Sequence, residues 1–347
     1  MGETKRMHYL DWAKAICIVL VAIGHFLPKG DAAKVVFYTF HVPVFILIGG
    51  FLLKCPTGIV DCLKKLLRIL TRIFVPYSIW HLLSGMYFIK RGARTWKDVW
   101  DTWFFLDGKT IWNEALWYAP MICVTTAVFL LLCWAVRGNR YVSLGVGALS
   151  LGAFAWLGMK GTPLTLFGHE NFMGGINLLL YFGVLAIGYA CRPVVQWIVE
   201  RKENPLKNPW LWGSAAAFVV FLGLADRFNH GDRISLLKLD YNNAIVFAIF
   251  AVLLSVSFLI ACALLPHHPL AELLAKNSLF LMCSHYFFYW WWIKDGGIST
   301  DPQFLRVRWA LAVMMLVLYI LVLFFFRFVC RKIPILSKIL MYLGMQF

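Results

Sequence analysis

The chain has 347 residues, of which 61% are hydrophobic and 14% are charged, and its mean hydropathy is +0.73. A soluble domain carries about a quarter charged residues, so this composition excludes a soluble enzyme or binding module. The formal net charge is +16, but the cations are spread through short loops instead of lying on one face or tail, so we expect no nucleic-acid partner. The sequence therefore predicts an integral membrane protein.

Apolar runs bounded by charged residues, Pro and Gly predict ten helices, each near the roughly 20 residues that cross about 30 Å of hydrocarbon. These helices are 10–28, 35–53, 73–89, 114–136, 141–159, 172–191, 209–226, 241–265, 277–293 and 308–327. We expect an all-α, polytopic bundle that forms a single domain over residues 1–347. No internal repeat of the kind that marks many transporters is visible.

The loop charges predict an orientation for the bundle. With a cytoplasmic N-terminus, the cytoplasmic segments hold eighteen Lys and Arg against five Asp and Glu, and the outer segments hold fourteen against ten. Short cytoplasmic loops favour Lys and Arg, so we expect both termini in the cytoplasm. This count includes Lys34, just before the helix 35–53, and Arg308, the first residue of the helix 308–327, among the cations of the outer segments.

Tryptophans gather at two places on the predicted membrane surface. Trp96, Trp100, Trp103, Trp112 and Trp117 surround the second outer loop, and residues 290–292 end the ninth span. Because Trp favours the headgroup level, we interpret them as interfacial anchors, with a sugar-binding role for some left open.

The sequence shows no sign of a metal or disulfide site. The nine cysteines include no CxxC pair, and no HExxH motif or Gly-rich phosphate loop is present. We therefore expect no metal and no tightly bound cofactor. Asp11 and Lys14 interrupt the first apolar run, so we do not expect a cleaved signal peptide.

The first predicted helix carries titratable residues that require a reason, because a charged group at the centre of a membrane helix costs about 2.5–3.5 kcal/mol on insertion scales. Lys14 and His25 are eleven residues apart, which places them within about 20° on one helix face and about 16 Å apart along the axis. Asp11 lies on the same side and can pair with Lys14. In a purely structural interpretation, Lys14 reaches the interface and His25 hydrogen-bonds a neighbouring helix.

Lys14, ten intervening residues and His25 resemble the Arg/Lys-x10-His signature of acyltransferase family 3, a family of multi-span membrane acyltransferases. Four further segments resemble motifs of that family in the same order: 40–53 (FHVPVFILIGGFLL), 64–77 with Arg68 and Arg72, 116–120 (LWYAP) and 278–285 (SLFLMCSH). Gly49 replaces the Ser that the second motif usually carries. The resemblance covers the whole length and is closest to the fucose-4-O-acetylase-like branch.

This resemblance implies acyl-CoA as a cytoplasmic co-substrate and a hydroxyl acceptor, commonly on a glycan, that is reached from the other face. Lys14, Arg68 and Arg72 would bind the phosphates of coenzyme A, since Arg forks onto phosphate oxygens. His25 would act as general base, because an unperturbed pKa of about 6.5 suits proton transfer at neutral pH; a covalent acyl-enzyme is the alternative.

Five residues are candidate supporting groups for this site: Asp11, His41, Glu114, Trp117 and His285. Each also has a simpler interpretation. The two histidines can serve packing or hydrogen bonding, Trp117 can anchor at the interface, and Glu114 can be a solvated acid at a helix start. The cations at 64–72 can be cytoplasmic loop charge alone.

We therefore expect a membrane O-acyltransferase in the cytoplasmic membrane of a bacterium. The expected acyl group is acetyl, and the expected acceptor is a cell-surface or lipid-linked glycan. The main alternative is a transporter or flippase for a glycan, lipid or small solute, which ten spans with polar residues also suit. The lack of repeats and the ordered motifs count against it. A membrane scaffold or sensor would leave Lys14 and His25 unexplained.

Overall fold

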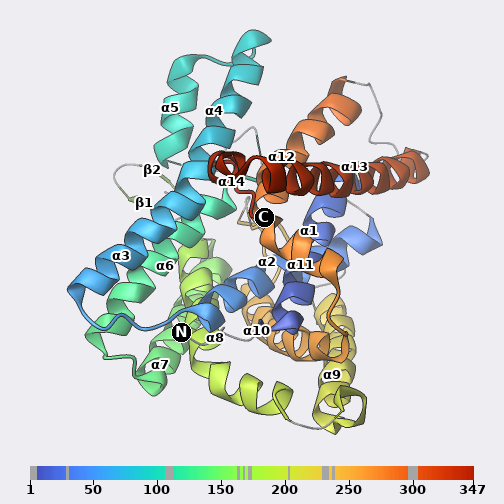
Figure 1. Ribbon diagram of the computed structural model, residues 1–347. Coiled ribbons are helices and arrows are strands. Elements are labelled where there is room, and N and C mark those ends of the chain that lie inside the picture. Colours follow the sequence, from blue (N-terminus) through green and yellow to red (C-terminus); the bar gives the residue numbers. More distant parts are fainter. Residues whose placement is uncertain are drawn as a thin grey trace.

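The computed structural model of the chain is a bundle of helices and describes residues 6–28, 31–105, 113, 115–161, 165–166, 169–170, 174–201, 204–228, 234–236, 239–295 and 304–347. Its helices are α1 (His8–Phe26), α2 (Ala32–Leu52), α3 (Ile59–Ile69), α4 (Val75–Lys90), α5 (Trp96–Phe105), α6 (Tyr118–Ala135), α7 (Arg140–Lys160), α8 (Asn177–Val199), α9 (Pro209–Phe228), α10 (Ala244–Ala261), α11 (Pro269–Lys276), α12 (Ser278–Tyr289), α13 (Leu305–Lys332) and α14 (Pro334–Met341) (Figure 1).

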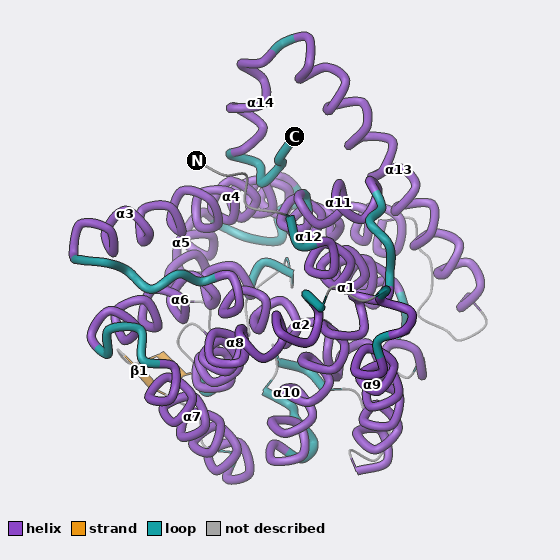
Figure 2. Tube along the Cα trace, turned by 60° about the horizontal axis from the view of Figure 1, so that its bottom comes forward, coloured by secondary structure: helices purple, strands orange, loops and turns teal. Residues whose placement is uncertain are grey.

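The remaining elements are short. Two π-helical turns, η1 (Leu70–Phe74) and η5 (Trp290–Asp295), follow α3 and α12, and the 3₁₀ turns are η3 (Pro205–Lys207) and η4 (Cys262–Leu264). The two-residue strands β1 (Thr165–Leu166) and β2 (His169–Glu170) pair antiparallel. Helices make up nearly all of the described chain (Figure 2).

Nine helical stretches in the described part of the chain are long and apolar enough to cross a membrane. They are α1, α2, the continuous stretch Ile59–Lys90, α6, α7, α8, α9, Ala244–Leu264 and α13. The one predicted span outside these nine stretches, the ninth in order at 277–293, corresponds to α12 followed by η5. The predicted all-α, polytopic membrane architecture is confirmed.

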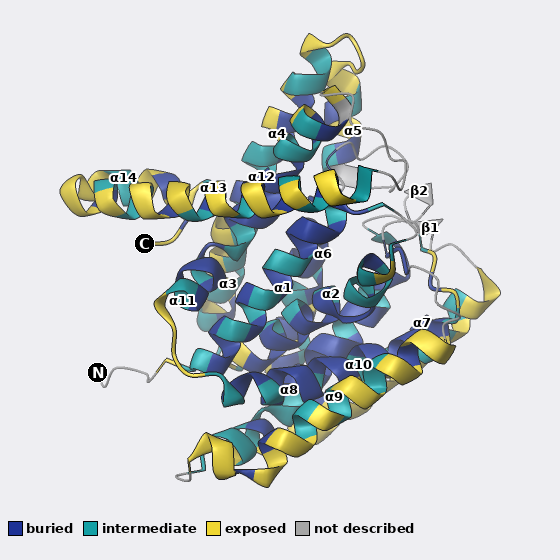
Figure 3. Cartoon of the chain, turned by 90° about the vertical axis from the view of Figure 1, so that its right-hand side faces the viewer, coloured by how far each residue is buried: buried dark blue, intermediate teal, exposed yellow. Residues whose placement is uncertain are grey.

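The spans form a buried centre and an exposed periphery. Helices α1, α2, α8 and α10 lie at the centre, where more than half of each apolar stretch is buried, against 11% of α9 and 17% of α7 (Figure 3). Large apolar side chains such as Leu149, Val219 and Phe328 point outward from α7, α9 and α13. Lipid tails solvate such side chains well, so a membrane protein need not cover them.

One predicted span is wrong in extent. The expected helix 73–89 is the second half of a 32-residue stretch, Ile59–Lys90, in which η1 joins α3 to α4. Pro76 has no N–H to donate to the preceding turn, and a π-helical turn is one way in which a helix continues past such a break. Residues 59–69 are too polar on one face to register as an apolar run, although they are helical.

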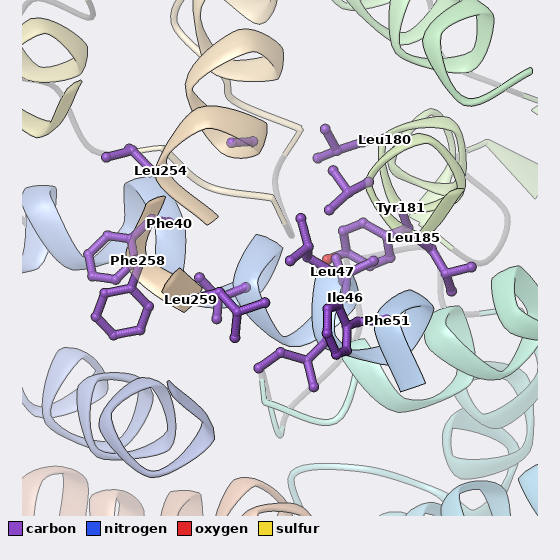
Figure 4. Packing of buried hydrophobic residues seen from close by; sticks show 14 of the residues in the cluster. Phe40, Ile46, Leu47, Phe51, Leu180, Tyr181, Leu185, Leu254, Phe258 and Leu259 are labelled. Atoms are coloured by element: carbon purple, nitrogen blue, oxygen red, sulfur yellow. The ribbon is translucent and has the colours of Figure 1, made fainter. Parts of the chain in front are cut away.

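Helix α2 crosses α8 at close range, and two glycines permit this approach. A Cβ on Gly50 would lie 1.9 Å from the carbonyl oxygen of Leu185, and one on Gly188 would lie 2.2 Å from that of Leu47. Figure 4 shows Leu47 and Leu185 within this buried cluster. Small residues let membrane helices approach closely. Gly49 itself has no atom within 4 Å of its Cβ position.

Both ends of the chain lie beside α11 and the start of α12. Near the N-terminus, Arg6 lies 3.6 Å from Glu272 of α11. At the C-terminus, the backbone N–H of Gln346 donates to Asn277 at 2.8 Å. Hydrogen bonds from Lys276 and His267, together with the charge of Arg6, lower the pKa of Glu272 to about 2. Arg6, the first described residue, and the C-terminal residues therefore lie on the same side of the bundle.

The expected pairing of Asp11 with Lys14 is wrong. Asp11 instead accepts two hydrogen bonds from Arg6, at 2.6 and 2.8 Å. The paired carboxylate raises the pKa of Arg6. The guanidinium forks onto both carboxylate oxygens, which the single ammonium of Lys14 cannot do.

Candidate functional site

His25 lies near the C-terminal end of α1 within a group of aromatic and imidazole rings. Its ring centroid is 5.1 Å from that of His285, 5.1 Å from that of Tyr286 and 6.3 Å from that of Tyr38. The ring of Tyr38 is in turn 5.1 Å from His41. Because α1 contacts both α2 and α12, residues from the two ends of the sequence converge here. We call these five residues the His25 cluster.

Two histidines of the cluster are held by their own helices. The Nδ1 atom of His285 is hydrogen-bonded to the carbonyl oxygen of Leu281 at 2.8 Å, and that of His41 to the carbonyl oxygen of Phe37. A carbonyl accepts only, so Nδ1 carries the proton in each ring and Nε2 is left as an acceptor. The Nε2 atom of His285 is buried and has no hydrogen-bond partner in the described part of the chain.

The side chain of His25 is more accessible than those of His41 and His285. His25 is half-buried, whereas His41 is 4% exposed and His285 is fully buried. A half-buried imidazole can contact a substrate while its neighbours hold it in place. The arrangement therefore suits His25 as the reacting group and His285 as a group that positions it.

Two buried cations cap the C-terminal end of α1 next to this cluster. Lys34 of α2 donates to the carbonyl oxygen of Leu27 at 2.9 Å, and Nε of Arg308 of α13 donates to that of Phe26. Both cations were counted with the outer segments, at the edges of the predicted helices 35–53 and 308–327, but the helices begin three residues earlier, α2 at Ala32 and α13 at Leu305. Helix C-termini attract cations, but the sequence alone does not say which helix end a distant Arg will reach.

The segment before α6 is tied to α12 close to His285. Asn113 is buried, and its side-chain amide donates to the carbonyl oxygen of Cys283 at 3.2 Å. Leu116, in the segment that resembles the LWFLP motif, is also fully buried. Trp117 lies just before α6 and packs on Tyr181 at a centroid distance of 6.0 Å. Glu114 lies outside the described residues.

The tryptophans divide between two environments. Trp96, Trp100 and Trp291 are more than half exposed, as expected of interfacial anchors. Trp290 is 1% exposed and stacks on Tyr87 with centroids 5.3 Å apart, so the anchor interpretation is wrong for this residue. The π-helical turn at η5 ends α12 with this ring turned inward.

The proposed donor-side residues lie apart from the His25 cluster. Lys14 is half-buried on α1 and makes no hydrogen bond or ion pair with any described residue. Arg68 and Arg72 are exposed on α3 and η1. Helix α3 extends to the edge of the bundle, away from α1 (Figures 1 and 2).

Within the described residues, no group of three or more His, Cys, Asp or Glu side chains could hold a metal ion. All nine cysteines are free thiols.

The comparisons with known proteins give one match. A family model described as an acyltransferase domain, that of acyltransferase family 3, matches residues 7–331, from just before α1 to the last turn of α13. No curated protein and no solved structure matches the chain. The match covers nearly the whole chain and identifies a membrane acyltransferase instead of a transporter. The chain belongs to acyltransferase family 3.

Proposed function

We propose that this protein is an O-acyltransferase that moves an acyl group from cytoplasmic acyl-CoA to a hydroxyl of a cell-surface or lipid-linked glycan. The proposed acyl group is acetyl. The observation that carries the proposal is the half-buried imidazole of His25, ringed by His285, Tyr286 and Tyr38, in a chain of an acyltransferase family. The loop charges support cytoplasmic termini, and we assign the protein to the cytoplasmic membrane of a bacterium.

His25 is the general base of the proposed reaction. It takes the proton of the acceptor hydroxyl as that oxygen attacks the thioester carbonyl, and the intermediate then expels the CoA thiolate, which accepts the proton. The new C–O bond of the ester forms in the first step, and the C–S bond of the thioester breaks in the second. His285, whose Nε2 atom is an acceptor, would position the His25 ring by holding one of its nitrogens.

The donor is proposed to approach from the N-terminal end of α1. Lys14 and His25 share one face of this helix and are about 16 Å apart along its axis. A phosphate group held by Lys14 would leave the pantetheine arm to extend along the helix towards His25. Arg68 and Arg72 would serve as an exposed entry surface for the anionic nucleotide end.

Lys14→Ala is expected to weaken acetyl-CoA binding by about tenfold or more, since a hydrogen bond to a charged group contributes about 1.5–3 kcal/mol. Lys14→Arg should retain binding, because it keeps the positive charge. Calorimetric titration of the purified variants with acetyl-CoA measures this. Lys54, an exposed cation just after α2, provides the control, since Lys54→Ala is expected to bind as wild type. Equal affinities for all four proteins would contradict the assignment.

His285→Ala is expected to lower kcat while the KM for acetyl-CoA stays near the wild-type value, because His285 positions the base and does not touch the donor. His285→Gln, which keeps a hydrogen-bond acceptor, should recover part of kcat. A purely structural role would instead lower the yield of folded protein and leave kcat per folded molecule unchanged. Steady-state rates normalised to folded protein separate these results.

A further inference from the structure

The C-terminal end of α1 carries two buried cations for which acyl transfer at His25 alone gives no reason. Arg308 is 2% exposed and Lys34 is 5% exposed. They come from helices far apart in sequence, α13 and α2, and bond the carbonyl oxygens of the consecutive residues Phe26 and Leu27. Charged side chains at membrane depth mark functional sites by default, because their burial is costly.

Capping of the helix end explains only part of this arrangement. A helix C-terminus supplies about half a negative charge, whereas the guanidinium of Arg308 alone brings a full positive charge to it. Arg308 uses Nε for the carbonyl oxygen of Phe26, but its Nη1 atom is buried and has no hydrogen-bond partner among the described residues. Arg308 also has no salt bridge to any described acid. A buried guanidinium with an unused donor is costly unless an anion completes it.

The neighbours of Arg308 make this cost larger. Phe26, whose carbonyl oxygen it bonds, is fully buried, and the Phe26 ring lies 6.0 Å from Tyr289 and 6.4 Å from Trp292. Apolar rings lower the local dielectric, which strengthens the attraction of the guanidinium for an anion and weakens its solvation by water. The site therefore favours an oxyanion over a neutral ligand.

The two cations lie next to the proposed base. Arg308 bonds the residue that directly follows His25. The Lys34 ammonium is 5.4 Å from the centre of the Tyr38 ring, which is itself 6.3 Å from the His25 ring. A sugar whose hydroxyl reached His25 could therefore place a substituent on the other side of its ring near Arg308.

We propose that Arg308, assisted by Lys34, binds an oxyanionic group of the acceptor, a carboxylate or a phosphate, so that the acceptor is an acidic glycan or a phosphate-bearing one. Arginine suits this task because its fork matches both groups with parallel hydrogen bonds. This inference rests on the proposed function, since it names the acceptor class of the His25 site.

The test is anion binding by the purified full-length protein. Binding is measured in detergent as a change in the temperature of thermal unfolding. The probes are methyl β-glucuronide against neutral methyl β-glucoside, and glycerol 3-phosphate against glycerol. A ligand that binds the folded state raises the unfolding temperature. We expect stabilisation by one anion, which identifies it as carboxylate or phosphate, and none by its neutral partner.

Arg308→Gln is expected to raise the Kd of that anion by about tenfold or more, and Lys34→Gln by less. Arg306→Gln is the matched control, because Arg306 is exposed on the same helix two residues away. If Arg308→Gln does not fold, Arg308→Lys, which keeps the charge but not the fork, should still weaken the binding. Equal effects at 306 and 308, or no preference of wild type for either anion, would overturn the proposal.

Acetyl-CoA binding measured on the same samples separates the two proposals. Loss of the anion preference with acetyl-CoA binding intact would overturn the acidic acceptor alone. Anion binding that depends on Arg308 without any binding of acyl-CoA would overturn the donor assignment and leave the anion site standing.

Discussion

His25→Ala is expected to lower the rate of acyl transfer by about 10²–10⁴-fold, the usual contribution of a general base. The side chain is half-buried and contacts its neighbours through ring edges, so its removal should leave the helix bundle folded. Lys14, about 16 Å away along α1, would still bind the donor. Initial rates of CoA release from acetyl-CoA, together with the affinity for acetyl-CoA, measure both halves of this prediction.

The control for this prediction is His267→Ala. His267 is exposed beside Glu272, away from the His25 cluster, and its replacement should leave the rate near that of wild type. Both variants lose one imidazole, so a difference between them reports position and not histidine content. Wild-type turnover by folded His25→Ala would remove the catalytic assignment.

Gly50→Ala is expected to destabilise the protein by about 1–3 kcal/mol or to prevent folding, because the added methyl group would meet the backbone of α8. The contact distance of 1.9 Å is to the carbonyl oxygen of Leu185, which cannot move away as a flexible side chain could. Helices α2 and α8 would have to separate, which would loosen the buried centre on which α1 packs. Thermal unfolding in detergent measures the effect.

Gly49→Ala provides a matched control one residue away. No atom lies within 4 Å of the Cβ position of Gly49, so the methyl group meets open space. Alanine favours a helix over glycine by about 1 kcal/mol, and this variant should therefore be as stable as wild type or more so. Equal losses at both positions would contradict the prediction, because helix propensity favours alanine at each position and only a Cβ on Gly50 would meet α8.

The sequence predicted the membrane spans because apolar runs of sufficient length have few other uses. The predicted spans were wrong where a segment is helical without being apolar throughout. Residues 59–69 are helical but amphipathic, so the start of the Ile59–Lys90 stretch was missed. Helix α5 was missed for the same reason, since polar residues alternate with its tryptophans. Hydropathy reports the environment of a residue, whereas hydrogen bonding decides whether the backbone is helical.

The site was predictable only in part. Motifs at the two ends of the chain named His25 and His285, and the structure brings their rings to 5.1 Å. The polar partners of these side chains were not predicted: Asp11 forms its ion pair with Arg6, and Arg308 donates a hydrogen bond to a backbone carbonyl 282 residues away. The partner of a charged side chain such as Arg308 depends on how the helices pack. The sequence of a single helix does not contain that information.

The central claim is that the protein takes its acyl group from acyl-CoA, and calorimetric titration of purified wild type with acetyl-CoA tests it most directly. The account predicts saturable binding that Lys14→Ala weakens, with slow release of CoA that depends on His25. Folded wild-type protein that binds neither acetyl-CoA nor succinyl-CoA would contradict the account.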